Sequence, residues 1–306
     1  MTIITKDFYK AAEEIISGNV VGLPTETVYG LGADALNENA VLKIYETKDR
    51  PVFNPVIVHV YDINELEKYA ENIPDEAYKL AEKFSPGPVT FVLKKKRTIP
   101  DIVTSGNESV GLRIPSHKLF RKVLKETMLP IAAPSANRSG RISPTSAEDV
   151  LSELEGRINF ILDGGTCEIG IESTIISFFD EDVKILRHGF VTKEDIEKVI
   201  GKISENKPGK IISPGLLKSH YAPVTPLRCV DDFERIKNVS DNNIGVLDFS
   251  KYNDFREIAM NLFSDLRKLD NQNYDLLVWK KLDDKGLGIA INDRLTRASF
   301  TMRNGQ

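Results

Sequence analysis

The sequence predicts an α/β protein with a mixed, twisted sheet and flanking helices, then a linker and a small doubly wound α/β domain. Its 306 residues are more than one core usually organises, which favours a second domain. Short apolar runs ending at Pro or Gly are mixed with helical patterns without strict alternation, which is typical of a mixed sheet. Near the C-terminus the order becomes strand, helix, strand, helix, as in doubly wound folds.

Helical periodicity and apolar runs give the elements of the first domain. Thr5 can cap a first helix, Gly18 ends it, and Pro24 ends the strand that follows. The segment PTETVYGLGADA at 24–35 holds glycines and small residues, which are expected where the backbone approaches a neighbour closely. The predicted helices are 4–17, 39–48, 63–84 and 146–154. The predicted strands are 20–23, 56–60, 89–93, 110–114, 129–133, 158–162, 173–178 and 183–187.

A change in composition marks the end of this domain. Segment 201–215 is rich in Gly, Pro, Lys and Ser, which is typical of a linker. Strands at 244–249 and 276–279 and helices at 254–269 and 286–299 follow it. The sequence therefore predicts a first domain over 1–200, a linker over 201–225 and a small Rossmann-like domain over 226–306.

Composition excludes several classes of protein. Lys and Arg total 41 against 45 Asp and Glu, a net charge of −4, whereas a protein that coats nucleic acid is normally basic. No window approaches the ~18 apolar residues of a membrane helix, and the N-terminus lacks a signal pattern, so a cytoplasmic protein is expected. Two cysteines and four scattered histidines favour neither a disulfide framework nor a metal site, so no metal held by protein side chains is predicted.

Cations and hydroxyls gather in loops at the expected strand ends. The segments are KDRP at 48–51 with Asn54, SVGLR at 109–113, PSANRSG at 134–140 with Ser143, and GIEST at 170–174. Guanidinium forks, small hydroxyl donors and exposed N–H groups are what phosphate and carboxylate recognition needs. Each segment alone could also be an ordinary polar loop, or a solvated helix end at Lys48. No Walker loop, GxGxxG or GxSxG pattern occurs, so the residues alone indicate only an anion-binding α/β domain.

Together these segments resemble a known family. PTETVYGL at 24–31, KDRPVFNP at 48–55, GLRIP at 111–115, PSANRSG at 134–140 and EST at 172–174 are similar in type and order to the YrdC-type threonylcarbamoyl-AMP synthases. SPG at 213–215 and HYAP at 220–223 resemble the two-domain form of that enzyme. The resemblance implies a YrdC-like fold and synthesis of L-threonylcarbamoyl-adenylate from L-threonine, bicarbonate and ATP, with release of pyrophosphate. This nucleotidyl transfer supplies the threonylcarbamoyladenosine modification of tRNA.

The resemblance also implies roles for individual residues. Lys48 and Arg50 would be the catalytic pair that neutralises phosphates, with Mg²⁺ accompanying ATP. The remaining residues expected on the ATP side are Asn54, Ser109, Ser135, Asn137, Ser143, Arg187 and Tyr221. Those expected to hold L-threonine are Thr27, His59, Arg113, the backbone of Ala133, and Ser173. A fork from Arg113 to the substrate carboxylate is the most direct pairing. Asp49 and His188 depart from the family pattern and put only fine geometry in question.

Water would hydrolyse both the carbamate and the mixed anhydride, so an element that closes the site is expected. The linker around His220 and Tyr221 is the candidate for this lid, with a plain tether as the alternative. The product is expected to pass to a tRNA threonylcarbamoyl transferase complex, with no stable nucleic-acid binding and no membrane association. The rival interpretation is a non-catalytic RNA-binding module, which the acidic charge and the scarcity of aromatic residues in the loops disfavour.

Overall fold

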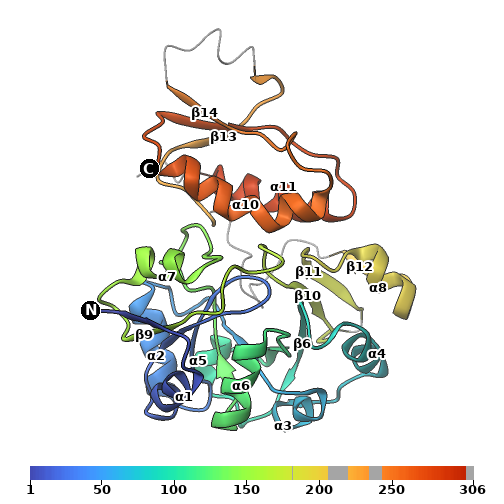
Figure 1. Cartoon of the computed structure of the whole chain (residues 1–306). Coiled ribbons are helices and arrows are strands. Elements are labelled where there is room, and N and C mark those ends of the chain that lie inside the picture. Colours follow the sequence, from blue (N-terminus) through green and yellow to red (C-terminus); the bar gives the residue numbers. More distant parts are fainter. Residues whose placement is uncertain (181, 206–219, 234–242, 301–306) are drawn as a thin grey trace.

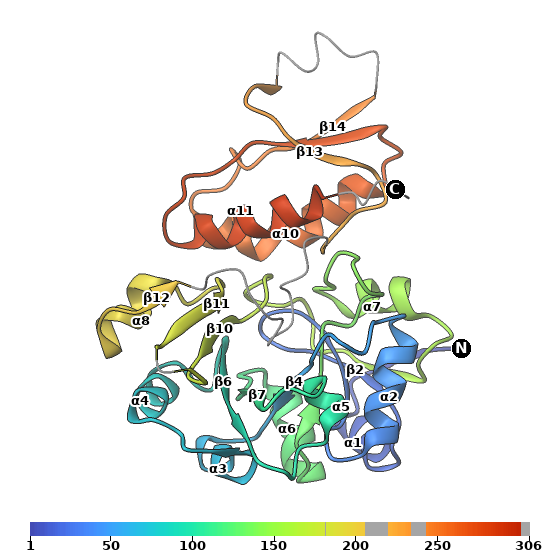
Figure 2. The same cartoon turned by 180° about the vertical axis from the view of Figure 1, so that it is seen from behind.

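The computed structural model describes residues 1–180, 182–205, 220–233 and 243–300. Figure 1 shows a larger domain, coloured blue to yellow, and a smaller domain, orange to red, stacked on it. Two helices of the smaller domain, α10 (Phe255–Asp270) and α11 (Leu287–Ala298), lie between its sheet and the larger domain. Figure 2 shows the same layering from behind. Most of the predicted linker, 206–219, lies outside the described residues.

One mixed sheet organises the larger domain. Its described strands are β1 (Ile3–Thr5), β2 (Val21–Leu23), β3 (Gly30–Asp34), β4 (Ile57–His59), β5 (Ala70–Glu71), β6 (Val89–Lys95), β7 (Ser109–Arg113), β8 (Ile131–Ala132), β9 (Phe160–Leu162), β10 (Thr174–Ser177), β11 (Lys184–Arg187) and β12 (Ser204–Glu205). They are ordered β1-β9-β2-β3-β8-β4-β7-β6-β10-β11-β12, with β5 beside β6. The sheet contains both parallel pairs, such as β4 with β7, and antiparallel pairs, such as β6 with β7, which confirms the predicted mixed sheet.

Helices cover both faces of this sheet. They are α1 (Phe8–Ile16), α2 (Glu38–Thr47), η1 (Ile63–Glu65), α3 (Leu66–Tyr69), α4 (Asp75–Phe84), α5 (Asp101–Thr104), α6 (Lys118–Thr127), α7 (Ala147–Leu154) and α8 (Lys193–Ile200). Helices α1 and α6 share one apolar cluster with strand residues such as Leu23 and Leu162. A second, larger cluster joins α2, α4, α7 and α8 to strand residues such as Leu31 and Val58. Burial of apolar surface on both faces holds the sheet in the middle.

The single helix predicted over 63–84 is wrong. The chain forms η1, α3, the short strand β5 and then α4. Pro74 explains the break, because proline disfavours the helical conformation of the preceding residue and lacks an N–H for a helix interior. Asn72, with φ +55°, turns the chain just before it. Pro74 is instead the N-cap of α4.

Other boundaries also differ from the prediction. The first helix is capped by Asp7, which accepts a hydrogen bond from the Tyr9 N–H, while residues 3–5 form β1 beside β9. Segment 24–35 contains a strand, β3, that was not predicted, and a Cβ on its Gly32 would lie 2.4 Å from a Leu23 methyl carbon. The close backbone approach expected in this segment is therefore confirmed, and it reflects strand packing. Helices α5, α6 and α8 and the first strand of the smaller domain were also not predicted.

The smaller domain has a parallel sheet of β13 (Leu227–Cys229), β14 (Ile244–Leu247) and β15 (Leu276–Trp279). The strand order is β13-β15-β14, and α10 connects β14 to its parallel neighbour β15 as in a βαβ unit. The apolar cluster under this sheet includes Leu262, Phe263 and Ile291 and continues into Ile142 and Ile171 of the larger domain. A shared core therefore joins the two domains.

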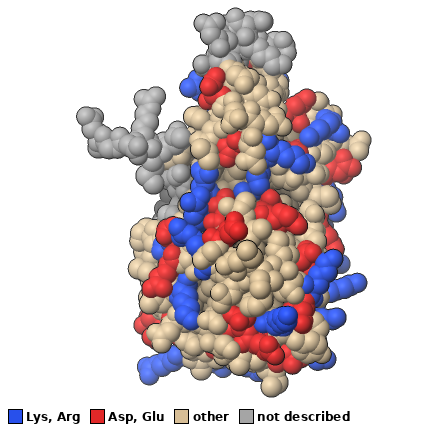
Figure 3. All heavy atoms as spheres, turned by 60° about the vertical axis from the view of Figure 1, so that its left-hand side comes forward, with Lys and Arg blue, Asp and Glu red and all other residues tan. Residues whose placement is uncertain are grey.

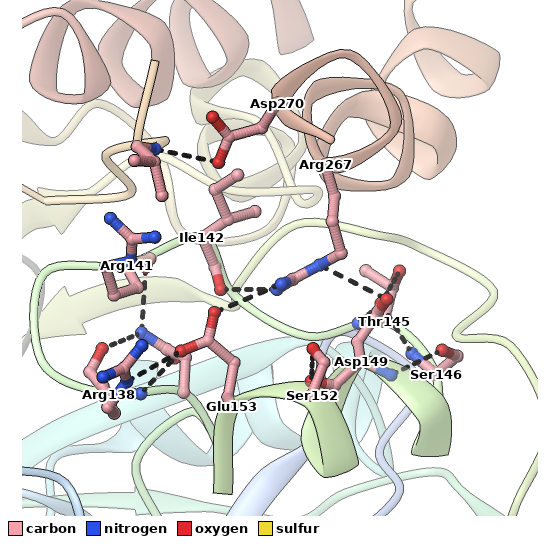
Figure 4. A network of polar contacts seen from close by, with 12 residues as sticks. Arg138, Arg141, Ile142, Thr145, Ser146, Asp149, Ser152, Glu153, Arg267 and Asp270 are labelled. Atoms are coloured by element: carbon pink, nitrogen blue, oxygen red, sulfur yellow. Dashed lines mark hydrogen bonds and ion pairs between the residues drawn. The ribbon is translucent and has the colours of Figure 1, made fainter. Parts of the chain in front are cut away.

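Polar contacts cross the same interface, as Figure 4 shows. Arg267 of α10 donates from Nη2 to the Ile142 carbonyl at 2.9 Å and from Nη1 to Glu153 at 3.2 Å. It also forms an ion pair with Asp149 at 3.3 Å. Asp149 and Glu153 both belong to α7, so one arginine fixes the angle between α7 and α10.

Gly170 gives a direct test of this packing. It has φ +79°, and a Cβ there would lie 2.3 Å from the Met260 carbonyl oxygen of α10. We expect Gly170→Ala to lower the free energy of unfolding by roughly 1–3 kcal/mol more than Gly165→Ala. Gly165 is the matched control because it has the same φ of +79° and nothing within 4 Å of the Cβ position. Urea unfolding of both variants measures the difference; equal losses would show that the α10 contact is unimportant.

Candidate active site

A partly open cavity of about 50 Å³ lies where loops of the larger domain meet the segment before the smaller one. Its lining residues are Thr25, Thr27, Val28, Gly30, Arg50, Ile57, His59, Arg113, Ala133, Pro134, Ser135, Glu172, Ser173, Arg187, His220 and Tyr221. These come from segments far apart in the sequence. Segments from the ends of several strands therefore line one cavity, as predicted.

Strand register explains why they meet. One row of neighbouring residues crosses the sheet from β8 to β11. Its members are Ile131, His59, Arg113, Thr90, Ile175 and Arg187. Paired residues on adjacent strands point to the same face, and although the register of β10 and β11 shifts between Ile175 and Ile176, Arg113 and Arg187 line the same cavity. They are three interstrand steps of about 4.8 Å apart, a span that two arginine side chains can bridge toward a ligand between them.

Arg113 is held in a buried ion pair. Its Nη2 donates to Glu26 Oε1 at 2.7 Å, and Nε donates to the Gly87 carbonyl at 3.4 Å. The other Glu26 oxygen accepts the backbone N–H of Ser116 at 3.1 Å. Both side chains are at most 5% exposed. The acid therefore fixes the guanidinium at the cavity wall, oriented for a carboxylate.

Arg187 is anchored through Ser173. Its Nε donates to the Ser173 carbonyl at 3.0 Å, and its Nη2 donates to the Ser173 hydroxyl at 3.1 Å. That hydroxyl is also 2.7 Å from the Thr90 hydroxyl. These hydrogen bonds link Arg187, which is predicted to bind the nucleotide, to Ser173, which is predicted to bind threonine. On the opposite wall, the Thr27 hydroxyl is 2.8 Å from that of Thr25, which fixes the loop after β2.

Lys48 and Arg50 follow α2 and are both buried. Arg50 lines the cavity and donates from Nη2 to the Pro55 carbonyl at 2.8 Å. The Lys48 ammonium donates to the carbonyls of Ser135 and Asn137, so it anchors the loop after β8. Burial lowers the pKa of Arg50 to about 10 and, with the charge of Arg50, the pKa of Lys48 well below its usual range.

Five predicted site residues do not line the cavity: Lys48, Asn54, Ser109, Asn137 and Ser143. Asn54 and Ser109 are buried, and their side-chain polar atoms lack hydrogen-bond partners among the described residues. The Asn137 amide nitrogen donates to the carbonyls of Arg138 and Arg141 within its own loop. Ser143 donates to Glu172 at 2.6 Å. Asn137 and Ser143 therefore support the walls in this structure.

Sequence analysis missed several groups that build the site. Glu26 and Glu172 lie inside the quoted motifs, so a signal for them existed, namely a carboxylate placed among cations. Thr90 carries no signal because it is an ordinary strand residue. Arg294 of α11 forms an ion pair with Glu172 at 3.1 Å across the domain interface. Only the tertiary structure shows that α11 reaches the cavity wall.

The two cavity histidines are neutral at pH 7. Burial, reinforced by the charge of Arg113, lowers the pKa of His59 to about 3. Burial likewise lowers the pKa of His220 to about 3, although Glu172 raises it, and the nearby cations Arg50 and Lys48 add to the lowering. His59 Nδ1 is 3.3 Å from the Ile131 carbonyl, and its ring lies 5.2 Å from that of Phe120. These histidines offer hydrogen bonds rather than charge, and neither is a strong base.

Positive charge is concentrated in the cavity, whereas charges of both signs are mixed on the surface. Figure 3 shows Lys and Arg interspersed with Asp and Glu over the face it presents, whereas the cavity concentrates three arginines. Among the described residues, no group of three His, Cys, Asp or Glu could hold a metal ion. No helix in that part of the chain is long and apolar enough to cross a bilayer. The arrangement is a small cationic basin lined by hydroxyls, suited to anionic ligands.

Comparisons with known proteins identify relatives along the whole chain. The family model described as "Telomere recombination" matches residues 13–189, and the model of the "Threonylcarbamoyl-AMP synthase, C-terminal domain" matches 191–299. The chain is 41% identical to the threonylcarbamoyl-AMP synthase of Pyrococcus abyssi, over 94% of this chain and 93% of that protein. It is 42% identical to the Bacillus subtilis enzyme of the same name, over 95% and 92%.

A solved structure shares the whole architecture. The crystal structure of P. abyssi Sua5 complexed with L-threonine superposes with a TM-score of 0.91 at 37% identity, covering 98% of this chain and 97% of that one. Fold and cavity thus define a two-domain α/β protein with a basin for anions. The chain belongs to the threonylcarbamoyl-AMP synthase family of Sua5 and YrdC proteins, in its two-domain form.

Proposed function

We propose that this chain is a nucleotidyltransferase that makes L-threonylcarbamoyl-adenylate from L-threonine, bicarbonate and ATP and releases pyrophosphate. One observation carries the proposal: Arg113, Ser173 and Arg187 line one cavity in a chain closely similar to named threonylcarbamoyl-AMP synthases. The product serves the threonylcarbamoyladenosine modification of tRNA.

The chemistry needs positioning more than a nucleophile. The neutral amine of threonine combines with bicarbonate to give a carbamate and water. A carbamate oxygen then attacks the α-phosphorus of ATP, and the bond to the bridging oxygen of pyrophosphate breaks. Because negative charge develops on phosphate oxygens, fixed cations and hydroxyls supply the main stabilisation.

Within this proposal, Arg113 pairs with the threonine carboxylate, and Thr27, His59, the Ala133 backbone and Ser173 surround that substrate. Lys48 and Arg50 neutralise phosphates, and Arg187 and Ser135 lie beside the nucleotide. The proposed roles of Asn54, Ser109, Asn137, Ser143 and Tyr221 also stay on the ATP side. Mg²⁺ would be held by phosphate oxygens and water, since Glu172, which lines the cavity, and Glu26, which lies behind Arg113, are already paired with arginines.

The proposal has a direct assay. We expect purified protein to release pyrophosphate from ATP only when L-threonine and bicarbonate are both present, with the adenylate detected by mass spectrometry. Leaving out either substrate is the internal control. Pyrophosphate release that ignores threonine or bicarbonate would contradict the proposal. Binding of single-stranded RNA without any turnover would favour the non-catalytic RNA-binding module instead.

We also propose that the catalytic domain spans 1–200, that 201–225 is a linker and lid, and that 226–306 is the C-terminal domain. Tyr221 supports the lid because it is fully buried, lines the cavity and stacks on Phe263 of α10 at 5.4 Å. A cytoplasmic location and transfer of the product to a tRNA threonylcarbamoyl transferase complex remain predictions of the same proposal.

The Tyr221 hydroxyl offers a test of the lid. It is buried without a hydrogen-bond partner among the described residues, so its loss should cost little stability. We expect Tyr221→Phe to raise the KM for ATP about tenfold, because a hydrogen bond to the nucleotide is lost, while the KM for threonine stays the same. Tyr78→Phe, at a hydroxyl that donates to Glu67 away from the cavity, is the control. Wild-type kinetics in Tyr221→Phe would reject the hydroxyl contact.

A further inference from the structure

Arg294 of the C-terminal domain reaches into the catalytic domain. Its side chain starts on α11 and is 0% exposed. Its Nε donates to Glu172 Oε2 at 3.1 Å, and its Nη1 donates to the His188 carbonyl at 2.6 Å. Its guanidinium carbon lies 5.8 Å from the centre of the Tyr221 ring, within the range of a cation–π contact.

Each of these contacts lies at the cavity or one residue from it. Glu172 lines the cavity and precedes Ser173, the anchor of Arg187. His188 follows Arg187 at the end of β11, and Tyr221 is itself a lining residue. A single side chain thus ties together three segments of the site that are remote in sequence.

The negative charge of Glu172 explains why a cation is needed beside it. A buried carboxylate at the wall of a basin for phosphates and carboxylates would repel its ligands. Burial alone would raise the pKa of Glu172, but Arg294, Arg187 and the hydrogen bond from Ser143 together hold it below its ordinary value. Glu172 therefore stays ionised, and Arg294 is the cation in direct contact with it.

Stability alone does not account for this arginine. Its remaining terminal nitrogen, Nη2, is buried without a hydrogen-bond partner in the described part of the chain. An unsatisfied buried donor on a charged group is costly, and an apolar side chain of similar size would avoid that cost. The arrangement is better suited to organising the site than to strengthening the core.

We propose that Arg294 is a positioning residue by which the C-terminal domain completes the active site, because it neutralises Glu172 and fixes the segments that carry Ser173, Arg187 and Tyr221. This inference rests on the proposed function, since it concerns the binding of that reaction's anionic substrates. It also assigns the C-terminal domain a role in catalysis beyond that of a tether.

The test uses the full chain and three substitutions assayed with ATP, threonine and bicarbonate. We expect Arg294→Met to lower kcat/KM for ATP at least about tenfold, since an unpaired carboxylate would remain at the cavity wall. We expect Glu172→Gln in the Arg294→Met background to recover much of that loss, because no charge is left to neutralise. Arg297→Met is the matched control: one turn away on α11, Arg297 pairs with Asp293 at 2.9 Å, and activity should change less than about twofold.

The outcomes separate this inference from the proposed function. If the unsubstituted chain makes no adenylate, the proposed function fails. If it does and Arg294→Met keeps normal kinetics, or Glu172→Gln gives no recovery, the role of Arg294 is overturned. Should Arg294→Met fail to unfold cooperatively, Arg294→Gln replaces it: glutamine keeps a hydrogen-bond donor but removes the positive charge that neutralises Glu172. Full activity of that variant would likewise overturn the inference.

Discussion

Arg113→Met is expected to raise the KM for L-threonine by about 100- to 1,000-fold while the KM for ATP changes little. The reason is that Arg113 is the cavity cation placed to pair with the substrate carboxylate, and losing one partner of a buried charge pair costs about 2–5 kcal/mol. Steady-state pyrophosphate release with each substrate varied in turn measures both constants. An equal rise in both KM values would place Arg113 outside the threonine subsite.

Two further variants separate binding from folding in this experiment. Arg113→Met leaves Glu26 buried without its partner, so Glu26→Gln is added to restore stability without restoring threonine affinity. Arg121→Met is the matched control, because Arg121 of α6 donates to the Tyr61 carbonyl at 2.7 Å and lies outside the cavity lining. Recovery of threonine affinity in the double variant would contradict a direct contact.

Lys48→Met is expected to lower kcat/KM for ATP by about 100- to 1,000-fold. The Lys48 ammonium holds the loop after β8 through the carbonyls of Ser135 and Asn137, and it supplies positive charge beside Arg50. Lys43→Met is the control: Lys43 lies on α2, the helix that Lys48 follows, and donates to the Gly18 carbonyl at 2.7 Å, outside the cavity lining. Comparable losses in both variants would reduce Lys48 to a helix-fixing role.

The same lysine gives ATP binding a pH dependence. Because burial lowers the pKa of Lys48 in the free protein, a bound phosphate must raise that pKa again. Binding then takes up protons, and the affinity for ATP weakens as the pH rises through the lowered pKa. Titration calorimetry in buffers of different ionisation enthalpy should show proton uptake that Lys48→Met abolishes. Proton release on binding would contradict this account.

Much of the site could be predicted from the sequence because its chemistry lies in short segments. Arg50, Arg113 and Arg187 each sit beside a Gly or Pro break or at a strand end, and all three line the cavity. Local patterns also located most strands, since an apolar run ended by proline is a local signal. The strand β3 was not predicted because its glycines and small residues, which pack closely against Leu23, do not form an apolar run.

The rest depends on contacts that local patterns do not encode. Nothing in the sequence near Glu172 shows that Arg294, 122 positions away, neutralises it. The row that brings Arg113 and Arg187 to one face follows from strand register, which is set by the whole sheet. Similarly, the local sequence around Lys48 is typical of a solvated helix end, yet the side chain is buried and contacts a loop 89 positions away in the sequence.

The central claim is that these strand-end segments form one basin that binds a nucleotide's phosphates beside an amino acid's carboxylate. A crystal structure of the protein soaked with L-threonine and ATP together tests it most directly. The account predicts the threonine carboxylate against Arg113 and the triphosphate along Lys48, Arg50 and Arg187. Electron density for the nucleotide on any other surface, or for threonine remote from Arg113, would contradict it.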